Sequence, residues 1–173
     1  MNYADIKRVD VANGPGVRVS LFVSGCTHRC PGCFNPETWD FQFGASFGEE
    51  QIQQILDYLR PKHIKGLSLL GGEPFEPENQ QAVLELVNRV RTELPQKDIW
   101  CYSGYLFESL AEGKIGTHSR ALLEQIDVLV DGPFILERKN LGLRFRGSDN
   151  QRIIRVQDSL NAGSIIHWDD AQT

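Results

Sequence analysis

The sequence has no excess of positive charge and no run of basic residues. Its 18 lysine and arginine residues are outnumbered by 23 aspartate and glutamate residues, which leaves a net charge of −5. Proteins that bind nucleic acid through the phosphate groups usually carry a basic surface. We therefore expect no nucleic-acid partner.

Long apolar runs are absent as well. No segment approaches the roughly 18 consecutive apolar residues of a membrane-spanning helix, and the opening stretch MNYADIKRVDVANGPG lacks the pattern of a signal peptide. We expect a soluble, cytoplasmic protein with no membrane partner. The chain also has no repeat, low-complexity tract or linker, and its 173 residues suit one domain over residues 1–173.

Cysteine is scarce, but most of it is clustered. Three of the four cysteines, Cys26, Cys30 and Cys33, follow the spacing C-x3-C-x2-C in CTHRCPGC. In a reducing compartment such a group indicates metal binding rather than a disulfide framework. Cys101 stands apart between aromatic residues, and we expect it to pack within a strand.

The rest of the chain alternates β-rich stretches with helical patterns. The expected strands cover residues 17–25, 67–70, 98–105 and 126–134, and the expected helices cover 48–61, 78–94 and 119–126. This order predicts an α/β fold with a mostly parallel sheet, and at this length a partial (βα) barrel is favoured over a complete eight-fold one. The cysteine loop would follow the first strand. Residues 151–168 depart from the alternation, and the NAG stretch within them could turn a terminal β-hairpin.

Each expected strand ends in a polar or glycine-rich loop. These loops read SGCTHRC, GGEP, YSGY and DGPF in chain order. Sites in parallel α/β folds gather at the carboxyl ends of the strands, so the four loops should converge on one face.

Three clustered thiolates suit either an iron–sulfur cluster or zinc. Zinc would need a fourth protein ligand, and His28 lies only two residues from both Cys26 and Cys30, which leaves little chain for a tetrahedral site. Three packed cysteines without a metal are a further alternative, although the neighbouring proline, glycine and histidine are not typical of a core. A cubic 4Fe-4S cluster on three cysteines leaves one iron open to a small molecule.

The combination of C-x3-C-x2-C after one strand and GGEP after the next resembles the radical S-adenosylmethionine (SAM) superfamily. With NGPGVRVSLFVSGCTHRCPGCFNPETW, DIWCYSGY, DVLVDGPF and FRGSDNQRII, the chain resembles more narrowly the family of activating proteins of anaerobic ribonucleotide reductases. This resemblance implies a partial (βα) barrel of the radical SAM type. Two positions depart from the pattern: Gly32 replaces the usual aromatic residue, and Pro133 replaces a lysine that some relatives carry.

The resemblance also implies roles for the loop residues. Cys26, Cys30 and Cys33 would ligate a 4Fe-4S cluster, and SAM would chelate its fourth iron. The residues expected to contact SAM are Gly71, Gly72, Glu73, Pro74, Ser103 and Asp131. Among them, Glu73 or the carbonyls of its loop would accept hydrogen bonds from the ammonium group, and Asp131 would accept them from the ribose hydroxyls. The same segments could instead be ordinary glycine turns.

The implied activity is reductive cleavage of SAM, followed by removal of a hydrogen atom from a glycine Cα of the anaerobic ribonucleotide reductase, which leaves a glycyl radical. A reductant such as flavodoxin would supply the electron. The alternative is a radical SAM enzyme that acts on a different protein or on a small molecule. Arg144, Arg146 and Arg152 could dock a partner or lie on a solvated surface, and none of the four histidines receives a catalytic role.

Overall fold

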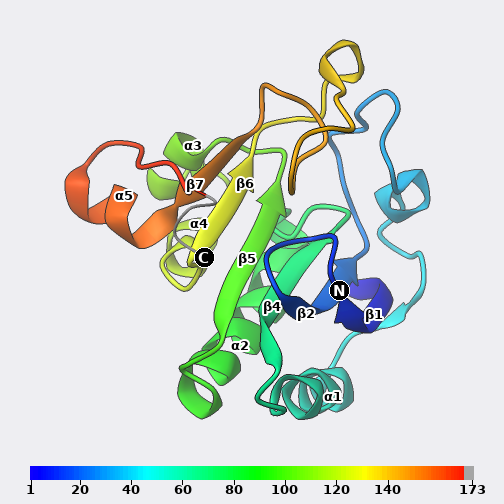
Figure 1. Cartoon of the computed structure of the whole chain (residues 1–173). Helices are drawn as coiled ribbons and strands as arrows, with labels where there is room; N and C mark the ends of the chain where they lie inside the picture. Colours follow the sequence, from blue (N-terminus) through cyan, green and yellow to red (C-terminus); the bar gives the residue numbers. More distant parts are fainter. Residues whose placement is uncertain (170–173) are drawn as a thin grey trace.

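The structure is a computed structural model that describes residues 1–169 (Figure 1). The strands are β1 (Asn2–Asp10), β2 (Val17–Val23), β3 (Ala45–Ser46), β4 (Ile64–Gly71), β5 (Asp98–Ser103), β6 (Val128–Asp131) and β7 (Arg152–Arg155). The helices are α1 (Glu49–Leu59), α2 (Pro77–Glu93), α3 (Phe107–Ala111), α4 (Ser119–Leu123) and α5 (Val156–Ala162), with 3-10 turns η1 (Pro36–Trp39) and η2 (Leu136–Arg138). Within the described residues, no helix has the length and apolarity needed to cross a membrane.

The strands form one sheet in the order β3-β1-β2-β4-β5-β6-β7. The central strands β2, β4, β5 and β6 run parallel to their neighbours in this group. By contrast, β1, β3 and β7 pair antiparallel at the two sides. The described part of the chain has no pairing between β3 and β7, so the sheet is open, with the predicted parallel strands at its centre.

The sequence-based prediction missed β1. The cysteine loop therefore follows the second strand, β2, and the expectation that it follows the first strand was wrong. The only buried residue of β1 is Asp10, and its sequence NYADIKRVD shows no regular alternation of apolar residues. Antiparallel pairing with β2 holds this strand in the sheet, and a single strand's own pattern does not reveal its pairing.

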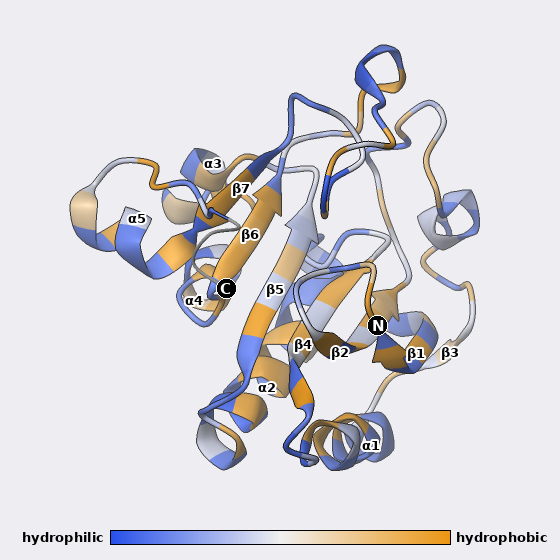
Figure 2. Ribbon diagram, in the orientation of Figure 1, coloured by the Kyte–Doolittle hydropathy of each residue, from blue (hydrophilic) through white to orange (hydrophobic). Residues whose placement is uncertain are grey.

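The main core lies between one face of the sheet and helices α1 to α4, and Figure 2 shows the apolar residues of the central strands. Alternate strand residues enter this core, as the period of a strand requires. They include Val19, Leu21, Val23, Leu67, Leu69, Ile99, Cys101 and Leu129. Cys101 is fully buried among them, so the prediction that it packs within a strand is confirmed.

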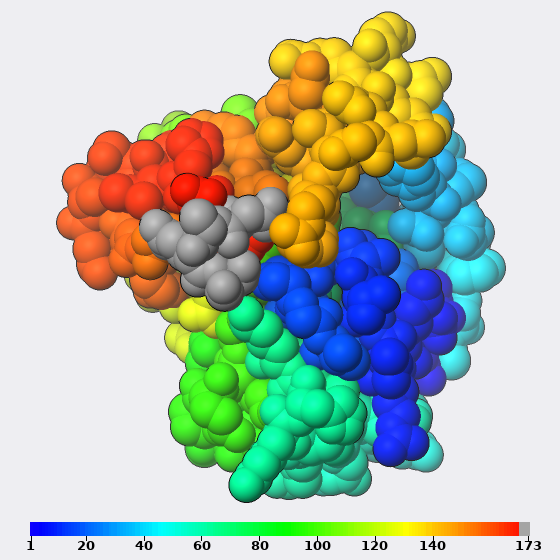
Figure 3. All heavy atoms as spheres, in the orientation of Figure 1, coloured from blue at the N-terminus to red at the C-terminus, as the bar shows by residue number. Residues whose placement is uncertain are grey.

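The opposite face of the sheet carries a smaller apolar cluster built on Trp100, Val128 and Val130. Phe145 packs on it, with its ring centroid 5.5 Å from that of Trp100. Phe145 belongs to residues 133–150, which we call the arch because this segment passes over that face of the sheet (Figures 1 and 3). The loop of residues 11–16 also folds onto this face, where the main-chain oxygen of Asn13 accepts a hydrogen bond from Ser68 Oγ at 2.6 Å.

The expected β-hairpin over residues 151–168 is replaced by a strand and a helix, β7 followed by α5. The NAG stretch ends α5, because Gly163 adopts the left-handed conformation (φ 68°) that commonly terminates helices. The chain then returns to β7 through a single antiparallel bridge between Ile154 and His167. The NAG stretch therefore does change the direction of the chain, but it does so at the end of a helix and not between two strands.

Candidate iron–sulfur and cofactor site

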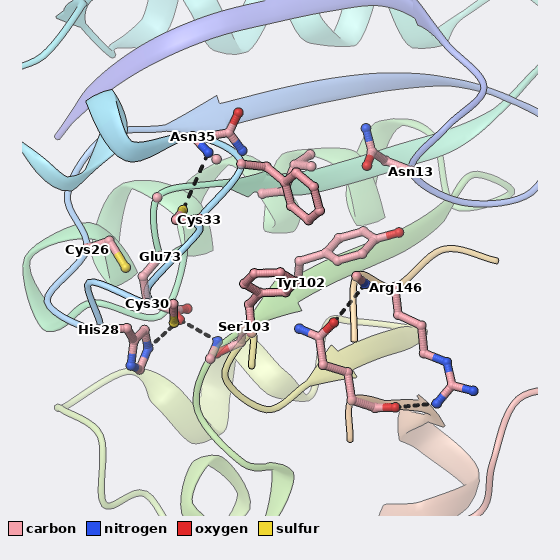
Figure 4. Close-up of a pocket in the computed structure, with 18 of the residues that line it drawn as sticks. Asn13, Cys26, His28, Cys30, Cys33, Asn35, Glu73, Tyr102, Ser103 and Arg146 are labelled. Carbon is pink, nitrogen blue, oxygen red and sulfur yellow. Dashed lines mark hydrogen bonds and ion pairs between the residues drawn. The ribbon is translucent and has the colours of Figure 1, made fainter. Parts of the chain in front are cut away.

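A cavity of about 590 Å³ opens at the carboxyl ends of the parallel strands, on the face opposite the main core (Figure 4). Of the predicted site residues, Cys26, Cys30, Cys33, Gly71, Gly72, Glu73 and Ser103 line it together. Pro74 and Asp131 are not among its lining residues. The convergence of the loops after β2, β4 and β5 was predicted from the sequence, and the DGPF loop contributes through Gly132 and Phe134 rather than Asp131.

The cysteine loop is held by main-chain contacts with the turn η1. The amide of Gly25 donates to the carbonyl of Thr38 at 2.8 Å, and the amide of Cys26 donates to the carbonyl of Trp39 at 3.3 Å. Gly32 has a φ of 75°, and a Cβ there would lie 2.7 Å from the Leu136 side chain of the arch. This backbone conformation disfavours any residue with a side chain, which explains why a glycine stands here in place of the usual aromatic residue.

The three thiols are half-buried, and burial makes two of them, Cys26 and Cys30, less acidic. Burial raises the pKa of the Cys26 thiol to about 12, and the nearby carboxylates of Glu73 and Glu76 act in the same direction. Burial also raises the pKa of Cys30, against a hydrogen bond from the main chain of Phe134. Thiolates at this site therefore need a positive partner, and a bound metal supplies it by displacing protons.

Three soft donors on one short loop, facing a cavity, fit a 4Fe-4S cluster with one open iron. In residues 1–169, no three His, Cys, Asp or Glu side chains are grouped closely enough to hold a single metal ion. Ligands of a cluster bind different iron atoms and can stand further apart than ligands of one zinc ion.

Glu73 connects three of the loops, although it is only 1% exposed. Its Oε1 accepts a hydrogen bond from the amide of Phe75 at 2.9 Å. Its Oε2 accepts one from the amide of Gly104 at 2.8 Å and lies 2.8 Å from His28 Nε2. The carboxylate that was expected to meet the SAM ammonium is therefore engaged within the protein, where it ties GGEP to the cysteine loop and to the loop after β5.

His28 is a site residue to which sequence reasoning gave no role. The hydrogen bond with Glu73 raises the His28 pKa, against the opposing effect of burial. The imidazole also packs edge-on against Tyr105, with ring centroids 4.4 Å apart. Its place between two of the clustered cysteines was visible in the sequence, but its partner Glu73 lies 45 residues further along the chain.

Two residues at the start of α2 were also missed. Glu76 Oε1 accepts hydrogen bonds from both the amide and the hydroxyl of Thr27, each at 2.6 Å. Asn79 donates to the carbonyls of Ser24 at 2.9 Å and Glu73 at 3.1 Å. Both side chains are buried, so α2 acts as a fixed support for the cysteine loop.

The glycines of GGEP are required by the packing of the chain on itself. The amide of Gly72 donates to the carbonyl of Val23 at 2.8 Å. A Cβ on Gly72 would lie 2.6 Å from the carbonyl oxygen of Gly25, and one on Gly71 would lie 2.8 Å from the backbone of β2. These contacts bring the loop directly against the cysteine loop.

Ser103 and Asp131 both make internal hydrogen bonds. Ser103 Oγ accepts from the amide of Tyr105 at 3.0 Å, as a turn residue does. Asp131 is fully buried, and its carboxylate accepts from the amide of Phe107 at 2.8 Å and from Arg152 Nε at 2.9 Å. A contact between Asp131 and a ribose would require this carboxylate to leave Arg152.

The three arginines considered for docking lie in different settings. Arg152 pairs with Asp131 and with Glu108, and these hydrogen bonds raise its pKa. Arg146 lines the cavity and donates to the carbonyl of Gln151 at 2.5 Å. Arg144 lies over the ring of Phe145, 4.7 Å from its centroid. Arg152 therefore has a structural role, and only Arg146 faces the site.

Comparison of the sequence with known proteins identifies the family to which the chain belongs. A family model described as a 4Fe-4S single cluster domain matches residues 12–154. An anaerobic ribonucleoside-triphosphate reductase-activating protein of Vibrio cholerae serotype O1 is 49% identical over 157 residues, which cover 90% of this chain and 98% of that protein. The protein of the same name from Escherichia coli K12 is 44% identical over 153 residues, 87% of this chain and 96% of the relative. That from Enterobacteria phage T4 is 40% identical over 155 residues, 88% and 93% of the two chains. The chain belongs to the family of anaerobic ribonucleoside-triphosphate reductase-activating proteins and carries its 4Fe-4S single cluster domain.

Proposed function

We propose that this protein is a radical SAM activase that generates a glycyl radical on the anaerobic ribonucleotide reductase. One observation carries the proposal: the three cysteines and the GGEP loop line a single cavity and are tied together by the buried carboxylate of Glu73. The names of the relatives supply the reductase as the protein acted upon.

In this proposal Cys26, Cys30 and Cys33 hold three irons of the cluster, and SAM binds the fourth. The reduced cluster would supply the single electron needed to cleave SAM into methionine and a 5′-deoxyadenosyl radical, and transfer of one hydrogen atom from a glycine Cα to that radical would give 5′-deoxyadenosine and the glycyl radical. The chain's own residues orient the reactants and exclude water. The aromatic side chains around the cavity, which include Phe22, Phe34 and Phe134, serve the second task.

The SAM contacts that we propose come mainly from backbone and small side chains. Gly71, Gly72 and the main chain of Glu73 line the cavity and would meet the amino-acid end, because the Glu73 carboxylate is already bonded inside the protein. Pro74, which does not line the cavity, would only hold the turn in place. Ser103 faces the cavity and would meet the cofactor through its hydroxyl. Asp131 would act indirectly, by fixing the turn at Gly132 through its bonds to Phe107 and Arg152.

The sheet supports the proposed partial barrel of the radical SAM type, because it leaves β3 and β7 unpaired with each other over residues 1–169. An open side would let a segment of a large protein reach the cavity. The electron would come from a low-potential one-electron donor such as flavodoxin. We place this chemistry in the cytoplasm, where a reducing environment keeps the thiols free.

An anaerobic reaction tests the proposal. The protein is reconstituted with iron and sulfide, reduced, and mixed with SAM and the anaerobic reductase, while EPR spectra and 5′-deoxyadenosine are recorded. We expect a glycyl doublet that appears together with 5′-deoxyadenosine. Deoxyadenosine without the doublet would reassign the substrate, and an absence of SAM cleavage would refute the radical SAM assignment.

A further inference from the structure

The cavity has two ends of different chemistry. In Figure 4 the three cysteines, His28 and Glu73 gather at one end, whereas Asn13, Tyr102 and Arg146 lie toward the other. The first end holds the groups that the proposed function assigns to the cluster and to the amino-acid part of SAM. The second end has no role in that assignment.

Tyr102 is the central residue of the second end. It lies one residue before the end of β5, and its side chain is on the cavity face, since its neighbour Cys101 points into the main core. Its hydroxyl is buried and has no hydrogen-bond partner within the described residues. A buried polar group normally has a partner, and one left without it is destabilising. Burial raises the pKa of Tyr102, so the hydroxyl keeps its proton and can donate.

Asn13 supplies a matching acceptor. Its Nδ2 donates to Asp10 Oδ2 at 2.7 Å, which orients the amide and leaves the oxygen Oδ1 for another donor. In Figure 4 this oxygen is on the side of the amide toward Tyr102. The pair thus offers one donor and one acceptor across the same part of the cavity.

This end of the cavity reaches the solvent. Lys7 and Ala12 line it and are exposed, and Figure 3 shows a hollow between the arch and the N-terminal segment. The walls there are apolar, with Leu70, Leu143 and Phe145 among them. A polypeptide segment can therefore enter here without displacing a ligand held at the cysteine end.

We propose that Tyr102 and Asn13 bind the backbone of the glycine-bearing segment of the protein substrate. The proposal rests on the proposed function and adds the place where the target residue is recognised. A glycine has no side chain, so a protein can identify and align it only through the peptide groups on either side. The Tyr102 hydroxyl donates to a peptide carbonyl and the Asn13 oxygen accepts from a peptide N–H, between apolar walls that exclude water.

The test is the substitution Tyr102→Phe, which removes the hydroxyl and keeps the ring. Three quantities are measured on the reconstituted protein: the Kd for SAM, the Kd for the intact reductase, and the number of glycyl radicals formed per 5′-deoxyadenosine. We expect the SAM affinity to stay unchanged. We expect the reductase to bind more weakly and the radical yield per deoxyadenosine to fall about fivefold, the equivalent of one neutral hydrogen bond.

The matched control is Tyr58→Phe on α1, where the hydroxyl accepts a hydrogen bond from Gln54 on the far side of the sheet. This variant should behave as the wild type in all three measurements. Since the Tyr102 hydroxyl has no internal partner, Tyr102→Phe should melt at or above the wild-type temperature, and a lower radical yield in a protein of undiminished stability separates recognition from folding.

Two results would overturn the inference while leaving the proposed function intact. A wild-type doublet with an unchanged yield in Tyr102→Phe would mean that the hydroxyl does not contact the substrate. A higher Kd for SAM would mean that the Tyr102 hydroxyl contacts the adenosyl part of the cofactor instead. If the wild-type protein forms no doublet at all, the proposed function fails, and this inference fails with it.

Discussion

Among single residues, Glu73 has the most consequential position, because one buried carboxylate holds three loops that come from distant parts of the sequence. Its partners are Phe75 in its own loop, Gly104 after β5 and His28 in the cysteine loop. Each partner is a donor, so the site needs an acceptor with two oxygens and no hydrogen of its own.

We predict that Glu73→Gln lowers the free energy of unfolding of the cluster-free protein by about 1–3 kcal/mol. In either orientation the amide nitrogen of glutamine would face a main-chain donor, the amide of Phe75 or that of Gly104. Urea unfolding measures the change, and iron content after reconstitution should fall in parallel. Glu78→Gln on the exposed side of α2 is the control, and equal stability of the two variants would contradict the role given to Glu73.

A second prediction at this scale concerns Gly72. Its Cβ would meet two main-chain oxygens, those of Gly25 at 2.6 Å and Thr38 at 2.8 Å, and backbone cannot rotate away as a side chain can. Gly72→Ala should therefore destabilise the protein by about 1–3 kcal/mol, as overpacking does, and reduce its iron content.

The control for Gly72→Ala is Gly142→Ala in the arch, where the nearest atom is the end of the flexible Asn140 side chain at 3.2 Å. Its unfolding free energy should change by no more than about 0.5 kcal/mol. A Gly72→Ala protein that is as stable as this control, in the same urea titration, would show that the GGEP loop can move away from the cysteine loop.

At the scale of elements, the connection between β1 and β2 is ordered by one buried carboxylate. Asp10 accepts hydrogen bonds from the amide of Ala12 at 2.8 Å, from Asn13 Nδ2 at 2.7 Å and from Ser20 Oγ at 2.5 Å. These bonds fold residues 11–16 onto the cavity face of the sheet. They thereby position Asn13, which the sequence alone would leave in an unremarkable turn.

This arrangement predicts a pH dependence. Burial raises the pKa of Asp10, but the hydrogen bonds from Ser20, Asn13 and Ala12 outweigh it and hold the pKa below its ordinary value of 3.8. A carboxyl group whose pKa is lower in the folded state stabilises the protein above that ordinary value, and this contribution is lost as the pH falls through the folded-state pKa.

Wild type and Asp10→Asn should therefore differ more in unfolding free energy at pH 6 than at pH 3. Urea titrations at the two pH values measure this, with Asp5→Asn, an exposed site on β1, as the control. A gap between wild type and Asp10→Asn that does not narrow at pH 3 would argue against the carboxylate as the source of the stability.

At the scale of the whole molecule, the two faces of the sheet have different roles: one carries the main core, and the other carries the cavity. Helices α1 to α4 and the main core stabilise one face. The other face carries the cavity, under the arch and beside the loop of residues 11–16. The cysteine loop connects β2 with α2 through Glu76 and touches the arch, where the rings of Phe34 and Phe134 lie 5.1 Å apart.

A bound cluster should therefore stabilise the whole chain, since it joins parts that otherwise meet only through loop contacts. We predict that the reconstituted protein melts at least about 5 °C above the cluster-free protein, as judged by the usual relation between stability and Tm. Cys30→Ala should bind little iron, lose SAM cleavage and lose this rise.

Cys101→Ala is the matched control, because Cys101 is fully buried in the main core on the other side of the sheet. It should keep its iron and sulfide content at a small cost in stability. Normal SAM cleavage by Cys30→Ala, or loss of the cluster in Cys101→Ala, would refute the assignment of the ligands.

Much of the site could be predicted from the sequence because its signals are local. The spacing of Cys26, Cys30 and Cys33, the glycines of GGEP and the apolar pattern of the central strands all lie within short stretches, and parallel strands necessarily present their carboxyl ends at one edge. The errors have the same origin. β1 depends on pairing with a neighbour rather than on its own pattern, and Gly163 gives the same turn signal whether it ends a helix or turns a hairpin.

The sequence by itself determined the ligand types, their spacing, the order of strands and helices and the family to which they are similar, because each of these is carried by neighbouring residues. Only the tertiary structure decided which polar groups are free to meet a ligand. Glu73 and Asp131 look available in the sequence but are bonded inside the protein, whereas Tyr102 looks like a strand residue but presents an unpaired hydroxyl to the cavity. The physical reason is that a hydrogen bond depends on distance in space, and the distant partners of these two carboxylates lie 21 to 45 residues away along the chain.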